Sequence, residues 1–205
     1  MTIIRNHIEL SGILQGIGCR PTIHRLATSF GLSGWVINTS DAVTIEIEGL
    51  EENCRQFLDS LRQSIPIPGK IDTIVVTGCQ PTGDREFIIK SSSFGVTRTT
   101  PIPPDVNTCP ECVKELFDPH NRRFLYPFTT CTVCGPRFTV ARSFPYDRER
   151  TSMADFKMCP DCEKEYESPD DRRFHSQTNS CFRCGPELRL LSSNGSRLIG
   201  DPIIK

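Results

Sequence analysis

The sequence predicts an α+β domain with the element order β-α-β-β-α-β, followed by a small, duplicated zinc-finger domain with four cysteines in each finger. Three observations support this prediction. Alternating and helical apolar patterns succeed one another in that order from residue 1 to residue 91. Eight of the eleven cysteines form four Cys-x-x-Cys pairs between residues 109 and 184. The last two pairs repeat the spacing of the first two, 50 positions further along the chain.

The first elements of the predicted domain are a strand, a helix and a second strand. The segment HIEL (7–10) alternates apolar and polar side chains, as a half-buried strand does. Pro21 suits the first turn of a helix. From Ile23 to Phe30, apolar residues then recur at i, i+3, i+4 and i+7, which places them on one helical face. The segment GWVIN (34–38) predicts the next strand.

The remaining elements of this domain follow the same logic. The segment VTIEIEG (43–49) alternates cleanly, and apolar residues from Cys54 to Leu61 again mark one face of a helix. The segment IPIPG (65–69) ends that helix. Two more strands are predicted at 71–78 and 86–90. The order is that of a ferredoxin-like, split βαβ unit in which two helices cover one face of an antiparallel sheet.

Changes in composition predict the domain boundaries. The α+β domain is expected to span residues 1–91. A proline-rich connector follows at 92–108, where the stretch TTPIPPD favours a stiff, extended chain. The cysteine-rich domain spans 109–187. Residues 188–205 are interpreted as a tail or as the start of a further domain.

Length and composition describe an ordinary globular chain. Its 205 residues are 37% hydrophobic and 24% charged, which is usual for globular proteins. The net charge of −1 gives no overall field that would attract nucleic acid or an anionic membrane. The start, MTIIRNHIEL, lacks the pattern of a secretory signal, and no apolar run reaches the roughly 18 residues of a membrane span. We therefore expect a cytoplasmic protein without a nucleic-acid or membrane partner.

The cysteine-rich region contains an internal duplication. Nearly half of the positions from Cys109 to Pro136 carry the same amino acid as the position 50 further on. Each copy has the spacing C-x2-C-x18-C-x2-C, so the predicted zinc-finger repeats cover 109–134 and 159–184. A duplicated supersecondary unit explains such a period.

Each repeat offers four thiolates to one metal ion. Two residues between paired cysteines let both sulfurs of a tight knuckle face the ion, and zinc takes four thiolates in closed structural sites. An iron–sulfur cluster also accepts four thiolates, but the paired knuckles and the duplication favour zinc. Because four sulfur ligands leave no open position, we expect two structural Zn²⁺ ions and no catalytic zinc. The predicted ligands are Cys109, Cys112, Cys131, Cys134, Cys159, Cys162, Cys181 and Cys184.

Other polar residues of this region are interpreted as structural. From Cys109 to Pro186 the numbers of basic and acidic residues are equal, so no surplus of positive charge is available for nucleic-acid phosphates. The Arg-Arg-Phe triplets at 122–124 and 172–174 are expected to pack their guanidinium groups on neighbouring turns and carboxylates. His120 and His175 have no counterpart in the opposite repeat. We interpret them as surface or local hydrogen-bonding groups and not as metal ligands.

The segment LQGIGCR (14–20) joins the first predicted strand to the first predicted helix. Gly16 and Gly18 permit backbone torsions and close approaches that a Cβ would hinder. Successive N–H groups can then point into one concavity, and the following helix adds its positive end. Arg20 brings a planar fork of donors that matches two phosphate oxygens. The loop therefore predicts a phosphate cradle, although many such turns only connect a strand to a helix. The candidate phosphate-binding residues are Gln15, Gly16, Ile17, Gly18, Cys19 and Arg20.

The predicted α+β domain resembles the acylphosphatase family. In that family a V-Q-G-V-G-F-R loop is followed by a functional asparagine, at the same spacing that separates Asn38 from Arg20 in this sequence. The resemblance implies an acylphosphatase sandwich with Arg20 and Asn38 as its catalytic residues. Arg20 and the N–H groups of the loop would hold the phosphate, and Asn38 would orient the attacking water. Cys19 departs from the family pattern, in which this position is usually Phe.

The cysteine repeats extend the resemblance to the HypF-type carbamoyltransferases, which mature [NiFe] hydrogenases. The segments YPFTTCTVCGPRFT (126–139), PYDRERTSM (145–153) and DRRF (171–174) are similar to the amino-terminal region of that family. Its full-length members continue with a YrdC-like nucleotide-binding domain and a carbamoyl-transferring domain, for which this chain leaves no room. The resemblance implies hydrolysis of carbamoyl phosphate, use of ATP only in those absent domains, and carbamoyl transfer to a cysteine of a HypE-type partner.

Two other functions remain open from the sequence. One is a non-catalytic, zinc-stabilised protein-interaction module that retains an acylphosphatase-like scaffold, which Cys19 slightly favours. The other is a standalone acylphosphatase with an appended zinc ribbon. Retention of the two loop glycines, Arg20 and Asn38 favours the enzyme. No nucleophilic role is expected for Cys19, and Cys54 and Cys79 are interpreted as structural.

Overall fold

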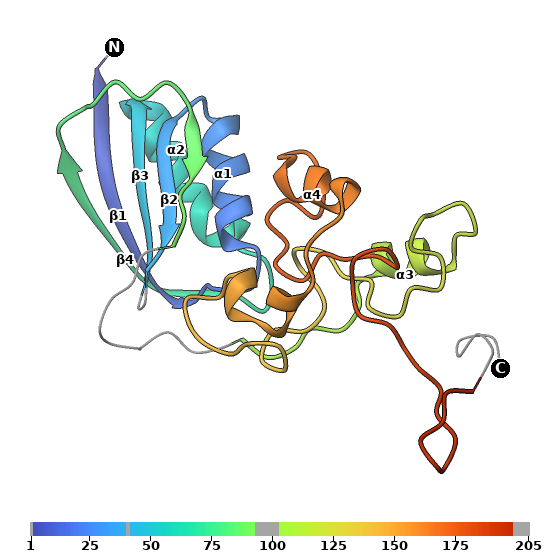
Figure 1. The fold of residues 1–205 in the computed structure, drawn as a ribbon. Coiled ribbons are helices and arrows are strands. Elements are labelled where there is room, and N and C mark those ends of the chain that lie inside the picture. The colour runs from blue at the N-terminus through green and yellow to red at the C-terminus, as the bar shows by residue number, and fades with distance from the viewer. Residues whose placement is uncertain (1, 40–41, 93–102, 199–205) are drawn as a thin grey trace.

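The computed structural model of the 205-residue chain describes residues 2–39, 42–92 and 103–198. A five-stranded sheet with two helices on one face forms the first part of the molecule, and a cysteine-rich part with short helices lies beside it (Figure 1). Most of the proline-rich connector lies outside the described residues. The elements in chain order are β1 (Ile3–Ile13), α1 (Cys19–Ser29), β2 (Ser33–Asn38), β3 (Val43–Leu50), α2 (Glu51–Ser64), β4 (Lys70–Cys79), β5 (Phe87–Ile89), α3 (Pro110–Phe117), η1 (Arg148–Arg150), η2 (Ser152–Asp155) and α4 (Pro160–Glu167).

The sheet has the strand order β4-β1-β3-β2-β5 and confirms the predicted α+β fold. β1 pairs antiparallel with β3 and with β4, and β3 pairs antiparallel with β2. The expectation of a wholly antiparallel sheet is wrong at β5, which runs parallel to β2. β4 and β5 lie at opposite edges, so the chain crosses the end of the sheet between them and enters β5 in the direction of β2.

The crossing segment is held by a buried cluster of charges. Glu48 accepts hydrogen bonds from the backbone N–H groups of Thr82 (2.7 Å) and Gly83 (2.8 Å). Arg5 donates to Glu48 and to Asp84, each at 2.7 Å. Burial alone would raise the pKa of Glu48, but the hydrogen bonds from Thr82, Arg5 and Gly83 outweigh it and lower that pKa. This anchoring places β5, and the chain that follows it, beside β2.

The hydrophobic core lies between the sheet and the two helices. Ile23 and Phe57, on the two predicted helical faces, are fully buried there. Three side chains of the segment that leads into α1 belong to the same core: Leu14 and Ile17 of the loop, and Cys19, the first residue of α1. Because these side chains point inward, the loop is fixed by apolar packing while its intervening glycines remain available at the surface of the core.

The cysteine-rich part is organised differently. Its hydrophobic cluster in the described residues consists of Cys112, Cys131 and Cys134, with Cys109 packed against them. Two features therefore replace an extended apolar core: the cysteine groups and a dense set of arginine hydrogen bonds, both described below. Among the described residues, no helix combines the length and the apolar character needed to cross a membrane.

The second repeat packs against α1, so that α4 lies closer to the sheet domain than α3 does (Figure 1). Arg25 on α1 donates to the carbonyl oxygens of Pro169 (2.9 Å) and Asp171 (2.8 Å). The rings of His24 and Phe174 meet edge to face with their centroids 5.2 Å apart. These contacts hold the two parts of the molecule together on the side where the glycine loop begins α1.

Candidate anion site and paired metal centres

The loop between β1 and α1 has the backbone that its glycines predict. Gly16 and Gly18 have φ angles of 73° and 79°, in the left-handed region that favours glycine. Gly18 is also the residue that caps the N-terminus of α1. Buried Ile17 and Cys19 flank it. The loop thus presents backbone, and not side chains, at the positive end of a helix.

The structure brings the two predicted catalytic residues to this loop. Arg20, Asn38, Gly16 and Gly18 line one small cavity of about 30 Å³. Asn38 ends β2 and is only 2% exposed. Its Oδ1 atom has no hydrogen-bond partner among the described residues. An unpaired buried amide oxygen is costly, and here it can accept a hydrogen bond from a water or ligand in the cavity.

Gln15, another predicted phosphate-binding residue, uses its side chain elsewhere. Its Nε2 donates to the carbonyl oxygen of Thr39 (2.7 Å), next to Asn38. Its Oε1 accepts from the backbone N–H of Tyr146 (3.1 Å). Gln15 therefore ties the loop to the end of β2 and to the cysteine-rich part. Any contact that it makes with an anion falls to its backbone N–H.

Arg20 is paired with a residue that the sequence analysis did not single out. Its Nη2 lies 2.7 Å from Oδ1 of Asp147, and its Nη1 donates to Ser92 Oγ at 3.1 Å. The Arg20 side chain is about one-tenth exposed, and that of Asp147 somewhat more. Asp147 belongs to the segment between the two cysteine repeats, residues 137–158, which we call the inter-repeat segment.

A second arginine contacts the glycine loop, and this one belongs to the inter-repeat segment. Arg137 is 2% exposed, and its Nε donates to the carbonyl oxygen of Gly16. Its remaining nitrogens donate to the carbonyl oxygens of Cys134 (3.0 Å), Pro136 (2.8 Å) and Thr132 (2.9 Å). One sequence signal could have found this residue. Arg137 follows the first Cys-Gly-Pro, whereas Glu187 follows the second, so the repeat is broken there.

The cysteine-rich part also closes the cavity sterically. A Cβ added to Gly18 would lie 2.7 Å from Cγ2 of Thr132, and one added to Gly16 would lie 3.2 Å from Cδ of Arg137 and from Cδ1 of Tyr146. The loop glycines therefore serve two needs, the left-handed backbone and the close approach of a second domain. The two glycines predict a close approach, but nothing in the sequence of the loop indicates that the cysteine-rich part makes it.

A larger hollow of about 610 Å³ adjoins the small cavity and shares Arg20, His175 and Gln177 with it. His175, interpreted from the sequence as a local polar group, is partly buried and lies near Arg20. Burial and the charge of Arg20 lower the pKa of His175 to about 4, so it is neutral at pH 7. His120, in contrast, is exposed. Neither histidine belongs to the cysteine groups described next.

Cys19 lies beside the cavity without the properties of a nucleophile. It is 2% exposed and packs in the core. Burial raises the pKa of its thiol to about 12, only partly opposed by the charge of Arg20. The thiolate is the reactive form of cysteine, so a raised pKa fits the expectation that Cys19 is not a nucleophile.

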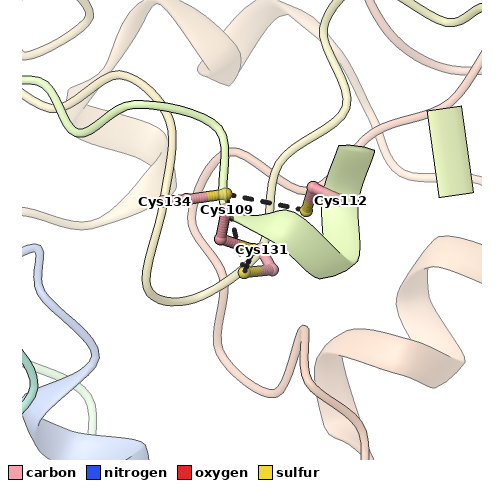
Figure 2. Close-up of side chains that lie close together, drawn as sticks. All are labelled: Cys109, Cys112, Cys131 and Cys134. Atoms are coloured by element: carbon pink, nitrogen blue, oxygen red, sulfur yellow. Dashed lines mark hydrogen bonds between the residues drawn. The ribbon is translucent and has the colours of Figure 1, made fainter. Parts of the chain in front are cut away.

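The eight paired cysteines form two groups of four, as the spacing predicts. In each group all four sulfurs lie within 4.8 Å of one another. Sulfur–sulfur distances in the first group are 3.8 Å (Cys109–Cys131), 3.6 Å (Cys131–Cys134) and 3.6 Å (Cys134–Cys112). Figure 2 shows these four side chains close together. In the second group they are 3.7 Å (Cys159–Cys181), 3.8 Å (Cys181–Cys184) and 3.5 Å (Cys184–Cys162).

These distances fit a tetrahedral zinc site. Four Zn–S bonds of about 2.3 Å define a tetrahedron with edges of about 3.8 Å, close to the separations found. They are far longer than the roughly 2.05 Å of a disulfide bond. Both groups have the same construction: the first cysteine caps a helix that begins with proline, and the second lies in that helix's first turn. The donor set therefore suits two Zn²⁺ ions.

Arginines of each repeat reach the cysteine group of the other repeat. Arg172 of the second repeat donates to Sγ of Cys109 (3.2 Å) and of Cys112 (2.7 Å). Arg122, its counterpart in the first repeat, donates to Sγ of Cys162 at 3.3 Å. A zinc ion with four thiolates would carry a net charge of −2, which each guanidinium would partly neutralise at the cysteine group of the opposite repeat.

The second arginine of each triplet completes this exchange. Arg123 donates to the carbonyl oxygen of Ser180 and pairs with Glu165, and Arg173 does the same with Thr130 and Glu115. Burial alone would raise the pKa of Glu165, but hydrogen bonds from Arg123 and Arg122 outweigh it and lower that pKa to about 2. The Arg-Arg-Phe triplets are thus packed on turns and carboxylates, as expected from the sequence. The reciprocal exchange between repeats was not expected.

Comparison with known proteins agrees with both parts of this description. Residues 6–89 match the acylphosphatase family, and residues 108–141 and 158–191 each match the HypF finger. The first part is 36% identical to the acylphosphatase of Thermotoga maritima, of which it covers 92%. The chain therefore belongs to the acylphosphatase family and carries two HypF fingers. This combination corresponds to the amino-terminal part of the HypF carbamoyltransferases and confirms the predicted resemblance.

Similarity to HypF proteins extends across both parts. The chain is 45% identical over 147 residues to the carbamoyltransferase HypF of Synechocystis sp., covering 72% of this chain. It spans about a fifth of the length of the curated carbamoyltransferases that it matches (19%). Among solved structures, a full-length HypF in a phosphate- and nucleotide-bound form gives a TM-score of 0.88 at 40% identity, covering 91% of this chain and 25% of that one. HypF of T. kodakarensis gives 0.86 at 43% identity, covering 97% and 25%.

Proposed function

We propose that this chain hydrolyses carbamoyl phosphate to carbamate and phosphate, with residues 1–91 as the catalytic domain. The observation that carries the proposal is the convergence of Arg20, the glycine loop and the unpaired Asn38 Oδ1 on one cavity. An acyl phosphate is a mixed anhydride with a good leaving group. Its hydrolysis needs stabilised charge and a positioned water more than a strong base, and this cavity offers those two things.

The groups around the cavity divide the chemistry between them. Arg20 and the N–H groups of residues 15–20 hold the phosphoryl oxygens, with the positive end of α1 behind them. The Oδ1 of Asn38 accepts a hydrogen bond from a water and turns its oxygen toward phosphorus. A bond forms between that oxygen and phosphorus, the bond from phosphorus to the bridging oxygen breaks, and carbamate leaves. The proton of the water passes to a phosphate oxygen.

The similar proteins support the choice of substrate class. The first part of the chain matches proteins named acylphosphatases, and 72% of the chain matches a carbamoyltransferase HypF. A similar HypF was solved with phosphate bound. We place the reaction as the first step of carbamoyl transfer in [NiFe] hydrogenase maturation in the cytoplasm. ATP and a HypE-type partner would act in the parts of a full-length protein that this chain does not contain.

The cysteine-rich part serves in this proposal as an interdomain scaffold. The eight cysteines form two groups, and each group would hold one structural zinc ion. Zinc supplies folding energy to such a site, because unfolded ligands do not bind it equally well. No step of the hydrolysis passes through the metal.

A non-catalytic protein-interaction module is the second candidate. The pairing of Arg20 with Asp147 favours it, because a carboxylate already occupies part of the guanidinium that a phosphate would use. The unpaired Asn38 Oδ1 favours the enzyme, since a scaffold gains nothing from a buried, unsatisfied acceptor. Measurement of phosphate release from carbamoyl phosphate and from acetyl phosphate separates the two.

Arg20→Ala tests the proposed function directly. Loss of a preorganised donor to the transferring group costs about 10²–10³-fold in turnover, so we expect phosphate release to fall at least that far. Asn38→Ala should lower turnover more than the affinity for phosphate. Arg55→Ala, at an exposed position on α2, is the matched control and should behave as the wild type. Turnover by Arg20→Ala equal to that of the control, with zinc content intact, would end the assignment.

A further inference from the structure

We infer that Arg137 is a positioning residue of the anion site, supplied by the cysteine-rich part to the glycine loop of the first domain. By donating to the carbonyl oxygen of Gly16, it fixes the orientation of that peptide unit, so that the loop presents N–H groups to the anion. The inference deepens the proposed function and rests on it. It also changes the role of the cysteine-rich part, which becomes a component of the phosphate site.

The peptide unit between Gly16 and Ile17 decides which group the loop presents to an anion. In a trans peptide the C=O and N–H bonds point in opposite directions, so a carbonyl held on one side directs the next N–H to the other. Gly16 has a φ of 73° and no Cβ, and a glycine tolerates both orientations of its peptide unit. Sequence alone therefore leaves this unit free to turn its carbonyl oxygen toward an anion, where it would repel the charge.

Arg137 removes that freedom. Its Nε donates to the carbonyl oxygen of Gly16, and its aliphatic chain packs beside the place where a Cβ of that residue would stand. With the carbonyl bound to a cation, turning the peptide unit over would cost a charge-assisted hydrogen bond at a site that is almost fully buried. The loop is thereby preorganised for anion binding before any substrate arrives.

Arg137 is itself held rigidly. Its two terminal nitrogens donate to three carbonyl oxygens around the second cysteine knuckle of the first repeat, those of Thr132, Cys134 and Pro136. All of its nitrogens thus have partners within the protein. Arg137 also lines the small cavity, but because its nitrogens all have protein partners, we assign it to positioning the loop, whereas Arg20 is assigned to binding the phosphate.

The position of Arg137 indicates that it is not one of the residues that hold the two repeats together. The residues that brace the two repeats occur in both copies, as Arg122 and Arg172 do. The equivalent position in the second copy is occupied by Glu187, which is exposed and pairs with Arg189. The arginine therefore stands only in the copy whose knuckle faces the anion site.

The first test compares Arg137→Met with Arg142→Met, a control in the same inter-repeat segment whose guanidinium is half exposed and pairs with Asp155. Because one N–H donor of the cradle loses its fixed direction, we expect kcat/KM for carbamoyl phosphate to fall about 100-fold, the effect of a lost oxyanion donor. The inhibition constant of inorganic phosphate should rise in parallel. Arg137→Lys, whose ammonium group can reach the same carbonyl, should recover part of the loss.

The second test uses the wild-type chain, so it still tests the role of Arg137 if Arg137→Met loses zinc or fails to fold. Inorganic phosphate is titrated into the ¹⁵N-labelled wild-type chain, and the Ile17 amide and the Arg137 Nε–H are followed by NMR. We expect the Ile17 signal to shift and exchange of the Arg137 Nε–H with solvent to slow at the same phosphate concentration.

The outcomes separate this inference from the proposed function. Wild-type kinetics in an Arg137→Met variant with two zinc ions, or an Ile17 amide that ignores phosphate while the protein is active, would overturn the role of Arg137. A wild-type chain that shows both NMR responses but releases no phosphate from acyl phosphates would refute the proposed function and support the cradle. Loss of activity in Arg137→Met alone, with zinc retained, supports both.

Discussion

Gly18 meets two structural requirements, one in each part of the molecule. Its φ of 79° begins α1, and the absent Cβ leaves room for the methyl group of Thr132 from the first cysteine repeat. Gly31 is a natural comparison, because its φ is 64° and a Cβ there would meet no atom within 4 Å. The two glycines share the backbone requirement, and only Gly18 has the interdomain contact.

Gly18→Ala should therefore destabilise the protein more than Gly31→Ala. A left-handed residue with a Cβ costs about 1–2 kcal/mol, which both variants incur. Overpacking against Thr132 adds about 1–3 kcal/mol for Gly18→Ala alone. The free energy of unfolding in urea, measured for each variant, gives the difference. Thr132→Ser keeps the hydroxyl but removes the methyl group, so it should rescue Gly18→Ala and leave Gly31→Ala unchanged. An equal loss of unfolding free energy in the two glycine variants would show that the contact between residue 18 and Thr132 has no effect on stability.

At this scale the sequence predicts the motif residues but not their partners. Arg20 and Asn38 could be proposed from the sequence because both belong to a short pattern with a fixed spacing, and the structure places both at one cavity. Asp147 could not, since it pairs with Arg20 across 127 positions and lies in a segment without periodicity. Side-chain pairing over such a distance depends on how two domains dock, and no local pattern encodes that.

Among the elements, those with sustained periodicity were predicted well. The helical stripe from Ile23 to Phe30 and the alternation of 43–49 both correspond to observed elements, α1 and β3. The predicted antiparallel direction of β5 is wrong, because its three residues indicate a strand but not its neighbour. Glu48 and Arg5 decide that neighbour by anchoring the crossing segment, which is a tertiary effect.

The two cysteine repeats are better regarded as one unit than as two independent fingers. Arginines of each repeat donate hydrogen bonds to the cysteine group of the other repeat. Those same arginines pair with a glutamate on the helix of the other repeat, Glu165 on α4 or Glu115 on α3. An outer-shell donor to a metal ligand typically changes metal affinity by about 10–100-fold. A substitution in one repeat should therefore change the metal affinity of the other repeat.

Arg172→Ala tests this exchange. Although Arg172 belongs to the second repeat, we expect zinc to leave the first centre more readily, by about 10-fold or more in affinity. Alkylation of cysteines during chelator titration, read by peptide mass spectrometry, shows which group of four opens first. Arg183→Ala is the control, because that exposed arginine pairs with Asp161 within its own repeat. Preferential opening of Cys159 and its group in Arg172→Ala would contradict the exchange.

On the scale of the whole molecule, the two parts are stabilised by different forces. An apolar core between sheet and helices holds the first part together. The second depends on cysteine groups, each of which would gain roughly 10–16 kcal/mol from zinc at neutral pH. The sole tryptophan, Trp35, lies in β2 and therefore reports on the first part only.

Removal of zinc should accordingly separate folding from activity. With a strong chelator present, the cysteine-rich part loses its main source of stability and releases Arg137 and Asp147 from the glycine loop. The sheet keeps its own core, so the emission of Trp35 and its urea midpoint should change little. Hydrolysis of carbamoyl phosphate should nevertheless fall at least about 10-fold, because the loop loses the groups that hold its peptide and its arginine in place. Readdition of Zn²⁺ should restore the rate. Full activity in the zinc-free chain would show that the first domain is complete by itself, whereas a simultaneous loss of the Trp35 signal would show that the two parts fold as one.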